Sequence, residues 1–319
     1  MQHLLKETFA IFLRTLAIIL MIELIIGIIG NVFMALVHCM DWVKTQKISL
    51  VNQILSALAI SRIFHLSLLL VGLVFSFSYA NLPMTSQMIR VINNAWFVTN
   101  HFSIWLATCL SVLYFLKIPK FSNSLFLYLK WRVEKVVSLT MLVSLILLIF
   151  NILLMNLVID ICKNEYQSNI SCSFTSHYYA KCHRQVLSLH IIFLSVPYFL
   201  SLSTLLLLIL SLWTHHKRMQ QHVQGCRDTR TVAHVKALQS VIAFFLLYTI
   251  FILSVLVQIW KYELVKKNIL AIFYQVIYVA FPSFHSYILI FGDMKLRQAC
   301  LSVLWWLKCR PSYVETLEL

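Results

Sequence analysis

The fold is decided by long apolar stretches such as residues 136–159, which read VVSLTMLVSLILLIFNILLMNLVI. This stretch contains no charged side chain and is bounded by Lys135 and Asp160. A helix needs about 20 apolar residues to cross the hydrocarbon core of a bilayer, which is roughly 30 Å thick. Because no water reaches that core to satisfy exposed backbone groups, a stretch of this length is expected to cross it as a helix.

Further stretches of the same kind precede and follow it, and together they predict an all-α bundle of seven transmembrane helices. The composition agrees, because 61% of the 319 residues are hydrophobic and only 12% are charged. We therefore expect a single membrane domain over residues 1–319. Its predicted spans are residues 9–37, 50–77, 89–116, 133–159, 187–213, 235–260 and 269–291, with a long loop at 160–186 and a tail at 292–319.

The Lys and Arg residues predict which way the bundle faces. Most of the 26 lie in the connectors after spans one, three and five and in the tail. Because cytoplasmic loops carry such an excess of positive charge, we expect a multi-pass cell-membrane protein with its N-terminus outside and its tail in the cytoplasm. The cations that give the net charge of +15 lie at helix ends, where they suit lipid headgroups, so nucleic acid is not an expected partner.

The predicted second extracellular loop, residues 160–186, offers two kinds of modification. It contains the sequon at Asn169, which the orientation makes available for glycosylation. Any two of Cys162, Cys172 and Cys182 could form a disulfide there, and the sequence does not assign the pairing. On the opposite side, Cys309 is either a palmitoylation site or a free interfacial thiol.

Polar residues inside the spans are costly in hydrocarbon, so they point to functional or structural sites. Asn31, Arg62 and His285 fall at a similar inner depth, and we expect them to form a hydrogen-bonded network. Such a network fixes helix positions, and its breakage could also accompany a conformational switch. Glu23, about two turns outward from Asn31, either lines an outer cavity or faces a neighbouring helix.

The sequence contains none of the common catalytic or metal-binding motifs that we considered. It has no nucleophile elbow, no zinc-protease helix motif, no phosphate-binding loop and no dinucleotide glycine fingerprint. The adjacent His215 and His216 do not share a helix face, which argues against a metal site. Neither an enzyme nor a cofactor is expected.

Several segments resemble the type 2 taste receptors, the bitter receptors, which are seven-helix G-protein-coupled receptors. The most specific is WLATCLSVLYFLKI at residues 105–118, followed by PSFHSYILI at 282–290. Others are GIIGN at 27–31, LAISRI at 58–63, FLYLKWR at 126–132, PYFLSL at 197–202 and FFLLY at 244–248. The resemblance covers all seven spans in order and implies a short cytoplasmic amphipathic helix after the seventh.

Other classes of membrane protein fit less well. Tyr114 stands in the place of the Asp/Glu-Arg-Tyr motif of rhodopsin-like receptors, and His285 in that of their Asn-Pro-x-x-Tyr motif. A vomeronasal type 1 pheromone receptor is the nearest alternative, against which residues 105–118 and 282–290 weigh. A polytopic transporter is the alternative from another class, but Pro197 and Pro282 do not lie in matched halves.

The resemblance implies a cavity for small bitter ligands among the outer halves of the spans. Trp96 and Asn100 are four residues apart, so they share one helix face. Few directional polar groups among many rings favour broad ligand tolerance. Glu23 and Arg90 are weaker candidates. The expected ligand-binding residues are Trp96, Asn100, His101, Tyr248, Phe251, Val255, Gln275 and Tyr278.

The resemblance also implies coupling to a gustducin-type heterotrimeric G protein inside the cell. Tyr248 is expected to relay ligand binding to Tyr114 and His215 near the inner ends of the helices. Whether the receptor acts alone or as a homo- or hetero-oligomer stays open. The basic residues expected to contact the G protein are Lys117, Lys120, Lys130, Lys217 and Arg218.

Overall fold

A computed structural model describes residues 2–78, 86–117, 124–168, 175–220, 229–260 and 268–309. Seven of its helices are long and apolar enough to cross a membrane, which confirms the predicted all-α bundle. These helices are α1 (Gln2–Thr45), α2 (Leu50–Ser78), α3 (Ser86–Lys117), α5 (Val133–Ser168), α6 (Thr175–Gln220), α7 (Thr229–Trp260) and α9 (Asn268–Gly292).

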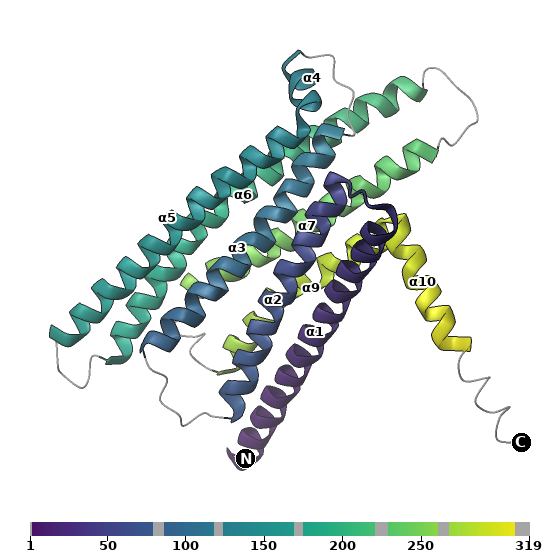
Figure 1. Ribbon diagram of the computed structural model, residues 1–319. Coiled ribbons are helices and arrows are strands. Elements are labelled where there is room, and N and C mark those ends of the chain that lie inside the picture. Colours follow the sequence, from purple (N-terminus) through teal and green to yellow (C-terminus); the bar gives the residue numbers. More distant parts are fainter. Residues whose placement is uncertain are drawn as a thin grey trace, which may run out of the picture.

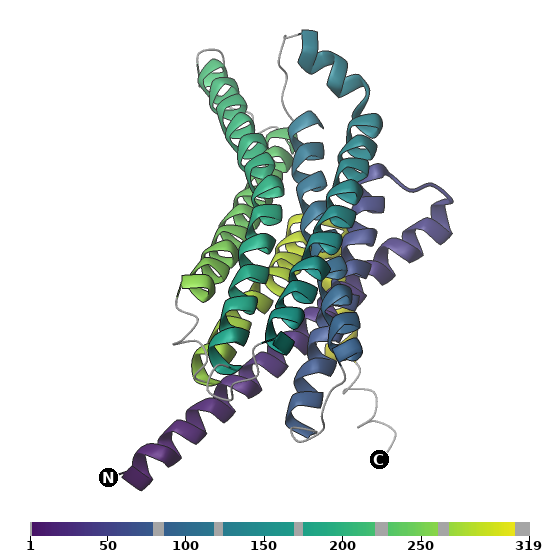
Figure 2. The same cartoon turned by 90° about the vertical axis from the view of Figure 1, so that its left-hand side faces the viewer.

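The seven long helices lie alongside one another with alternating directions (Figure 1). We call the end at which α1, α3, α6 and α9 begin the N-side, and the end at which they finish the C-side. The short α4 (Ser124–Trp131) lies at the C-side and comes between α3 and α5 in the sequence. Figure 2 gives the view from the side, in which α1 is inclined to the other helices.

Several helices extend beyond the spans expected from hydropathy. Helix α1 continues to Thr45, α5 to Ser168, and α6 begins at Thr175. Because a helix satisfies its own backbone hydrogen bonds, it can continue past the membrane into water. Much of the predicted loop 160–186 is therefore helical, while Asn169 and Cys172 lie outside the described residues.

Two of the three cysteines predicted in this region are neighbours in the structure. Cys162 at the end of α5 and Cys182 at the start of α6 are both free thiols. Burial, with a further contribution from Cys162, raises the pKa of the Cys182 thiol to about 12. A thiol with so high a pKa stays protonated at neutral pH and is a poor nucleophile.

Helices α1 and α9 approach each other closely at two glycines. A Cβ atom at Gly27 would lie 2.9 Å from a methyl carbon of Leu66 and would collide with the Ser283 hydroxyl. A Cβ atom at Gly30 would lie 3.0 Å from the Tyr287 ring. Small residues allow transmembrane helices to pack at this distance, as the predicted role of residues 27–31 requires.

The helix expected after the seventh span is present as α10 (Met294–Cys309). It turns away from the bundle at the C-side (Figure 1). The Asp293 carboxylate accepts hydrogen bonds from the backbone N–H groups of Lys295, at 2.8 Å, and Leu296, at 3.0 Å, and so caps the helix. Trp305 and Trp306 are exposed near its end, as suits a helix lying at a membrane surface.

Candidate functional site

A cluster of rings lies in the N-side half of the bundle, between α3, α6 and α9. Trp96 of α3 stacks on Tyr278 of α9, with 5.6 Å between ring centroids. His190 of α6 lies 5.4 Å from Trp96 and 5.1 Å from Phe97. Trp96 is half-buried, whereas Tyr278 and His190 are buried. Two residues predicted to bind a ligand, Trp96 and Tyr278, are thus in direct contact.

A line of polar groups, which we call the polar chain, runs beside these rings. The amide oxygen of the buried Asn100 accepts a hydrogen bond from the Tyr278 hydroxyl at 3.1 Å, and its amide nitrogen lies 3.4 Å from Nε2 of His190. The Tyr278 hydroxyl also lies 2.8 Å from Nε2 of His65 on α2. Nδ1 of His65 lies 2.9 Å from the Thr99 hydroxyl. The polar chain therefore joins α2, α3, α6 and α9.

Helix α7 supplies the wall that faces α6 and α9. The ring of Phe251 lies 5.1 Å from that of Tyr278, so it extends the ring cluster. The Tyr248 hydroxyl donates a hydrogen bond to the backbone oxygen of Leu194 on α6 at 2.7 Å. Val255, further toward the N-side, is buried. These three predicted residues of α7 all face the interior.

Other predicted ligand-binding residues lie apart from this cluster. His101 is buried on α3 with its ring 5.8 Å from that of Trp105. Gln275 is exposed on α9. Arg90 forms an ion pair with Asp160, which ties α3 to α5. The structure therefore gives Arg90 a partner within the bundle.

Glu23 is half-buried on α1, close to α9. Its backbone oxygen lies 3.5 Å from the Ser283 hydroxyl. Among the described residues, the carboxylate oxygen Oε2 of Glu23 has no hydrogen-bond partner. This position fits the expectation that Glu23 faces a neighbouring helix.

Arg62 of α2 is fully buried in the middle of the bundle and organises a second polar group, the Arg62 network. Its guanidinium donates from Nε to Ser103 at 3.3 Å, from Nη1 to Ser286 at 2.9 Å and from Nη2 to Nδ1 of His285 at 2.6 Å. The Ser286 hydroxyl lies 2.9 Å from the amide oxygen of Asn31. Asn31, Arg62 and His285 thus belong to one network across α1, α2, α3 and α9.

The charge of Arg62 is compensated by neutral groups. Among the described residues, no carboxylate forms an ion pair with Arg62. A buried cation is stable only when its N–H groups are hydrogen-bonded, and here hydroxyl and imidazole acceptors do this. A shift of α3 or α9 relative to α2 therefore costs hydrogen bonds to a charge.

Aromatic contacts connect the ring cluster with the Arg62 network. Phe251 lies 5.7 Å from Phe281, whose ring stacks on His285 at 6.2 Å. A second route runs from Tyr248 to Phe244 at 5.6 Å and from Phe244 to His285 at 5.1 Å. Both routes end on the imidazole that accepts a hydrogen bond from Arg62. Packed rings therefore extend from the N-side cluster to the middle of the bundle.

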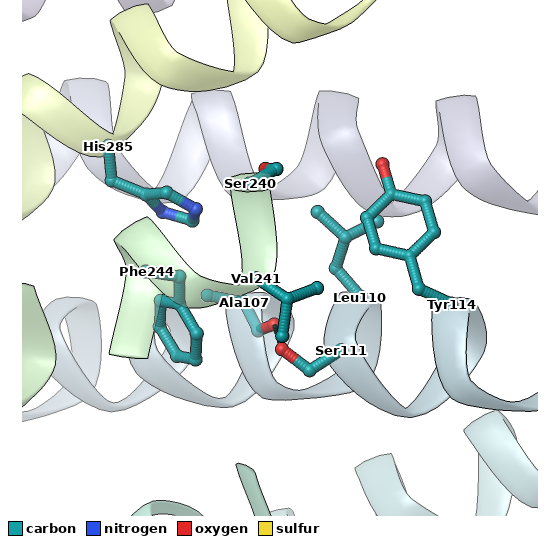
Figure 3. Close-up of a pocket in the computed structure, with 8 residues that line it drawn as sticks. All are labelled: Ala107, Leu110, Ser111, Tyr114, Ser240, Val241, Phe244 and His285. Atoms are coloured by element: carbon teal, nitrogen blue, oxygen red, sulfur yellow. Dashed lines mark hydrogen bonds between the residues drawn. The ribbon is translucent and has the colours of Figure 1, made fainter. Parts of the chain in front are cut away.

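A small hollow lies on the C-side of these rings, between α3, α7 and α9 (Figure 3). His285 stands at one end of it and Tyr114 at the other, with Val241 and Leu110 between them. The predicted relay residue Tyr114 is therefore on the same hollow as His285. The full lining is Ala107, Leu110, Ser111, Tyr114, Ser240, Val241, Phe244 and His285.

The predicted cytoplasmic contacts are only partly described. Lys117 is exposed at the end of α3, and Nζ of Lys130 in α4 lies 5.8 Å from the centroid of the Phe126 ring. Lys120 lies outside the described residues. The backbone of α6 includes His215, Lys217 and Arg218, whose side chains are not described, and the same holds for Cys309 in α10.

Five residues of these two polar groups were not predicted from the sequence: His65, Thr99, His190, Ser103 and Ser286. His65 lies one turn from Arg62 on α2, and Ser103 lies near Asn100 on α3. Polar side chains that recur at helical spacing beside a predicted buried residue share its face, and this spacing was the available signal. His190 carried no such signal, because its neighbours on α6 are apolar.

Comparison with known proteins finds relatives that match nearly the whole chain. A family model described as taste receptor protein (TAS2R) matches residues 9–308. The chain is 72% identical to taste receptor type 2 member 117 of Rattus norvegicus and 66% identical to member 109 of the same species, each over the full length of both chains. It is 50% identical to taste receptor type 2 member 14 of Macaca mulatta, over 93% of each chain.

Proposed function

Because the chain belongs to the taste receptor type 2 family, we propose that it is a bitter-taste receptor that binds small bitter compounds and activates a gustducin-type G protein. The ligand site is the N-side ring cluster with the polar chain beside it. The G-protein site is the C-side, next to the hollow between α3, α7 and α9. The receptor is a multi-pass protein of the cell membrane rather than an enzyme.

The N-side of the bundle faces the outside of the cell in this proposal. The excess of Lys and Arg in the connectors of the C-side supports that orientation. Glycosylation at Asn169, which follows α5 in the sequence, is the modification expected for that orientation. Treatment with peptide N-glycosidase should shift the protein on a gel, and Asn169→Gln should abolish the shift. A glycosylated protein with its N-terminus in the cytoplasm would contradict the orientation.

The single observation that carries the proposed ligand site is the stack of Trp96 on Tyr278 with Asn100 hydrogen-bonded to the same tyrosine. Rings of this kind offer flat apolar surface, and the amide and phenol offer a few directed polar groups. Small, largely apolar compounds with one or two polar atoms suit such a site. Phe251 and Val255 of α7 complete its wall.

Activation follows if a ligand binds the active arrangement more tightly than the resting one. Tyr248 holds α7 to α6 through the Leu194 carbonyl and contacts Phe244, which touches His285. A ligand that displaces Phe251 or Tyr248 therefore shifts α7 beside the hollow. Opening of that hollow exposes Tyr114 and admits a helix of the G protein. The basic residues proposed to contact the partner are Lys117, Lys120, Lys130, Lys217 and Arg218.

Calcium imaging tests the function directly. Cells that express the chain with a chimeric G protein are screened against a panel of bitter compounds. We expect at least one compound to give a concentration-dependent signal, and we expect Trp96→Ala and Asn100→Ala to raise its half-maximal concentration at least tenfold. Trp260→Ala is the matched control, because Trp260 is 85% exposed at the end of α7 and should leave the response unchanged.

Surface expression of each variant is measured in the same cells. Silence of the wild-type receptor toward the whole panel, despite normal surface expression, would contradict the ligand-gated function. Unchanged responses of Trp96→Ala and Asn100→Ala would leave the function in place but would refute this ligand site.

A further inference from the structure

Each hydrogen bond of the polar chain has a donor and an acceptor, and the number of available protons indicates which group donates. The Tyr278 hydroxyl carries one proton but touches two groups, the amide oxygen of Asn100 at 3.1 Å and Nε2 of His65 at 2.8 Å. An amide oxygen can only accept a hydrogen bond, so the phenol proton belongs to the contact with Asn100. Nε2 of His65 must then carry a proton and donate it to the phenol oxygen.

The same argument assigns the hydrogen bond between His65 and Thr99. When a neutral imidazole carries its proton on Nε2, its Nδ1 is an acceptor. Nδ1 of His65 lies 2.9 Å from the Thr99 hydroxyl, which can donate to it. The Thr99 hydroxyl also lies 2.9 and 3.1 Å from the backbone oxygens of Ala95 and Trp96, so its donation to His65 takes the place of those two contacts. The polar chain then passes from Thr99 through His65 and Tyr278 to Asn100.

At its other end the polar chain fixes the tautomer of His190. The Asn100 amide nitrogen only donates, so Nε2 of His190, 3.4 Å away, is an acceptor. The proton of the neutral His190 ring must then lie on Nδ1. His190 is 3% exposed, and within the described part of the chain its Nδ1 has no hydrogen-bond partner. A buried N–H group without a partner is unfavourable and rare in native proteins.

We propose that Nδ1–H of His190 is the hydrogen-bond donor that the ligand site presents to its ligands, and that it selects flat aromatic compounds with a carbonyl oxygen. This inference rests on the proposed function and names the ligand class of the same site. Trp96 and Phe97 lie 5.4 and 5.1 Å from the His190 ring, so a flat ligand that reaches Nδ1 also contacts aromatic faces. A carbonyl oxygen of such a ligand would accept a hydrogen bond from the Nδ1–H group of His190.

Asn100 and His65 act as positioning residues for this donor. If the polar chain ran the other way, with the Asn100 amide turned by 180°, His190 would present a lone pair and the site would select donors such as amines or phenols. The direction of the polar chain therefore decides which polar group a ligand needs. His65 supports this direction from α2, because a proton on its Nε2 leaves the phenol proton of Tyr278 directed at Asn100.

The imidazole ¹⁵N resonances of purified receptor in lipid nanodiscs test the direction, because protonated and unprotonated ring nitrogens differ widely in chemical shift. Loss of signals in His190→Phe assigns the His190 ring. We expect the wild-type proton on Nδ1 of His190 and on Nε2 of His65. A proton on Nε2 of His190 would overturn the proposal. This readout needs no G protein, so its outcome is independent of whether the receptor signals.

Ligand selection is tested with 1-indanone and indane, two bicyclic compounds of the same shape of which only the first has a carbonyl. Binding is followed at the indole nitrogen of Trp96. We expect 1-indanone to bind wild type at least fivefold more tightly than His190→Phe, which keeps the aromatic ring, and to shift the His190 Nδ1 resonance. Indane should bind both forms equally. Equal effects of both compounds, or no shift with 1-indanone, would overturn the proposal.

Discussion

The contact of α9 with α1 and α2 and the contact between α6 and α7 are built from different interactions. The first contains the Arg62 network and the close approach at Gly27 and Gly30. The second consists of rings and hydroxyl contacts, including the bond from Tyr248 to the Leu194 carbonyl. Rings can slide with little loss of contact, whereas a buried cation loses hydrogen bonds abruptly. We infer that α1, α2, α3 and α9 form a frame against which α6 and α7 move.

The largest expected loss of stability comes from Arg62→Ala, which lies in the frame. Loss of the guanidinium removes a hydrogen-bond partner from Ser103, Ser286 and His285, and a buried polar group left unpaired costs about 1–3 kcal/mol. We expect a loss of about 3 kcal/mol or more in the free energy of unfolding and low surface expression. Thermal unfolding in detergent measures the loss. Arg297→Ala, at an exposed position of α10, is the control, and equal stability of the two variants would refute the frame.

The second-largest loss of stability is expected from Gly27→Ala, where α1 packs closely against α9. Gly27→Ala places a methyl group against Ser283 and Leu66, and overpacking of this kind costs about 1–3 kcal/mol. Gly72→Ala is the matched control, because no atom lies within 4 Å of its added Cβ. Thermal unfolding should separate the two variants. If Gly72→Ala destabilises as much as Gly27→Ala, the close packing does not hold the frame.

A smaller loss of stability is expected on the movable side. Tyr248→Phe removes the hydrogen bond to the Leu194 carbonyl and should cost about 0.5–1.5 kcal/mol. Because the bond lies where α7 moves, the agonist concentration for half-maximal calcium response should change more than in Gly27→Ala. Tyr128→Phe, at an exposed position of α4, is the control. Normal signalling of Tyr248→Phe would remove Tyr248 from the relay.

The smallest effect is expected at the surface of the C-side. Nζ of Lys295 lies 3.1 Å from the Asp41 carboxylate and joins α10 to α1, but its side chain is 68% exposed. Exposed ion pairs contribute about 0–1 kcal/mol, and salt screens them. Lys295→Ala should therefore change thermal stability slightly at low salt and not at high salt. A large loss at both salt concentrations would mean that α10 belongs to the frame.

The sequence predicted the number of helices from the long apolar stretches, and it predicted the Arg62 network from the polar residues inside them. In a membrane protein the lipid-facing and the interior faces are both apolar, so only polar residues mark the interior. Asn31, Arg62 and His285 stood out in this way. The same property hides helix rotation: nothing in the apolar run of α6 indicates that Leu194 is buried while Ile192 is exposed.

The candidate site was harder to predict in detail for the same reason. Trp96, Asn100 and Tyr278 came from the resemblance to a family, and the structure brings them together. Gln275 and His101 came from the same source, yet the first is exposed and the second lies beside Trp105. Their positions depend on the rotation of α9 and α3. Contacts between distant segments set this rotation, and local sequence does not contain them.

Distances between spin labels test the division into frame and movable part most directly. Labels carried by unnatural amino acids are placed at Gln53 of α2, Gln239 of α7 and Phe291 of α9, which are exposed near the C-side. With an agonist from the calcium screen, the distance from Gln53 to Gln239 should increase while that from Gln53 to Phe291 stays constant. An unchanged distance to Gln239, or a change in the distance to Phe291, would contradict this account.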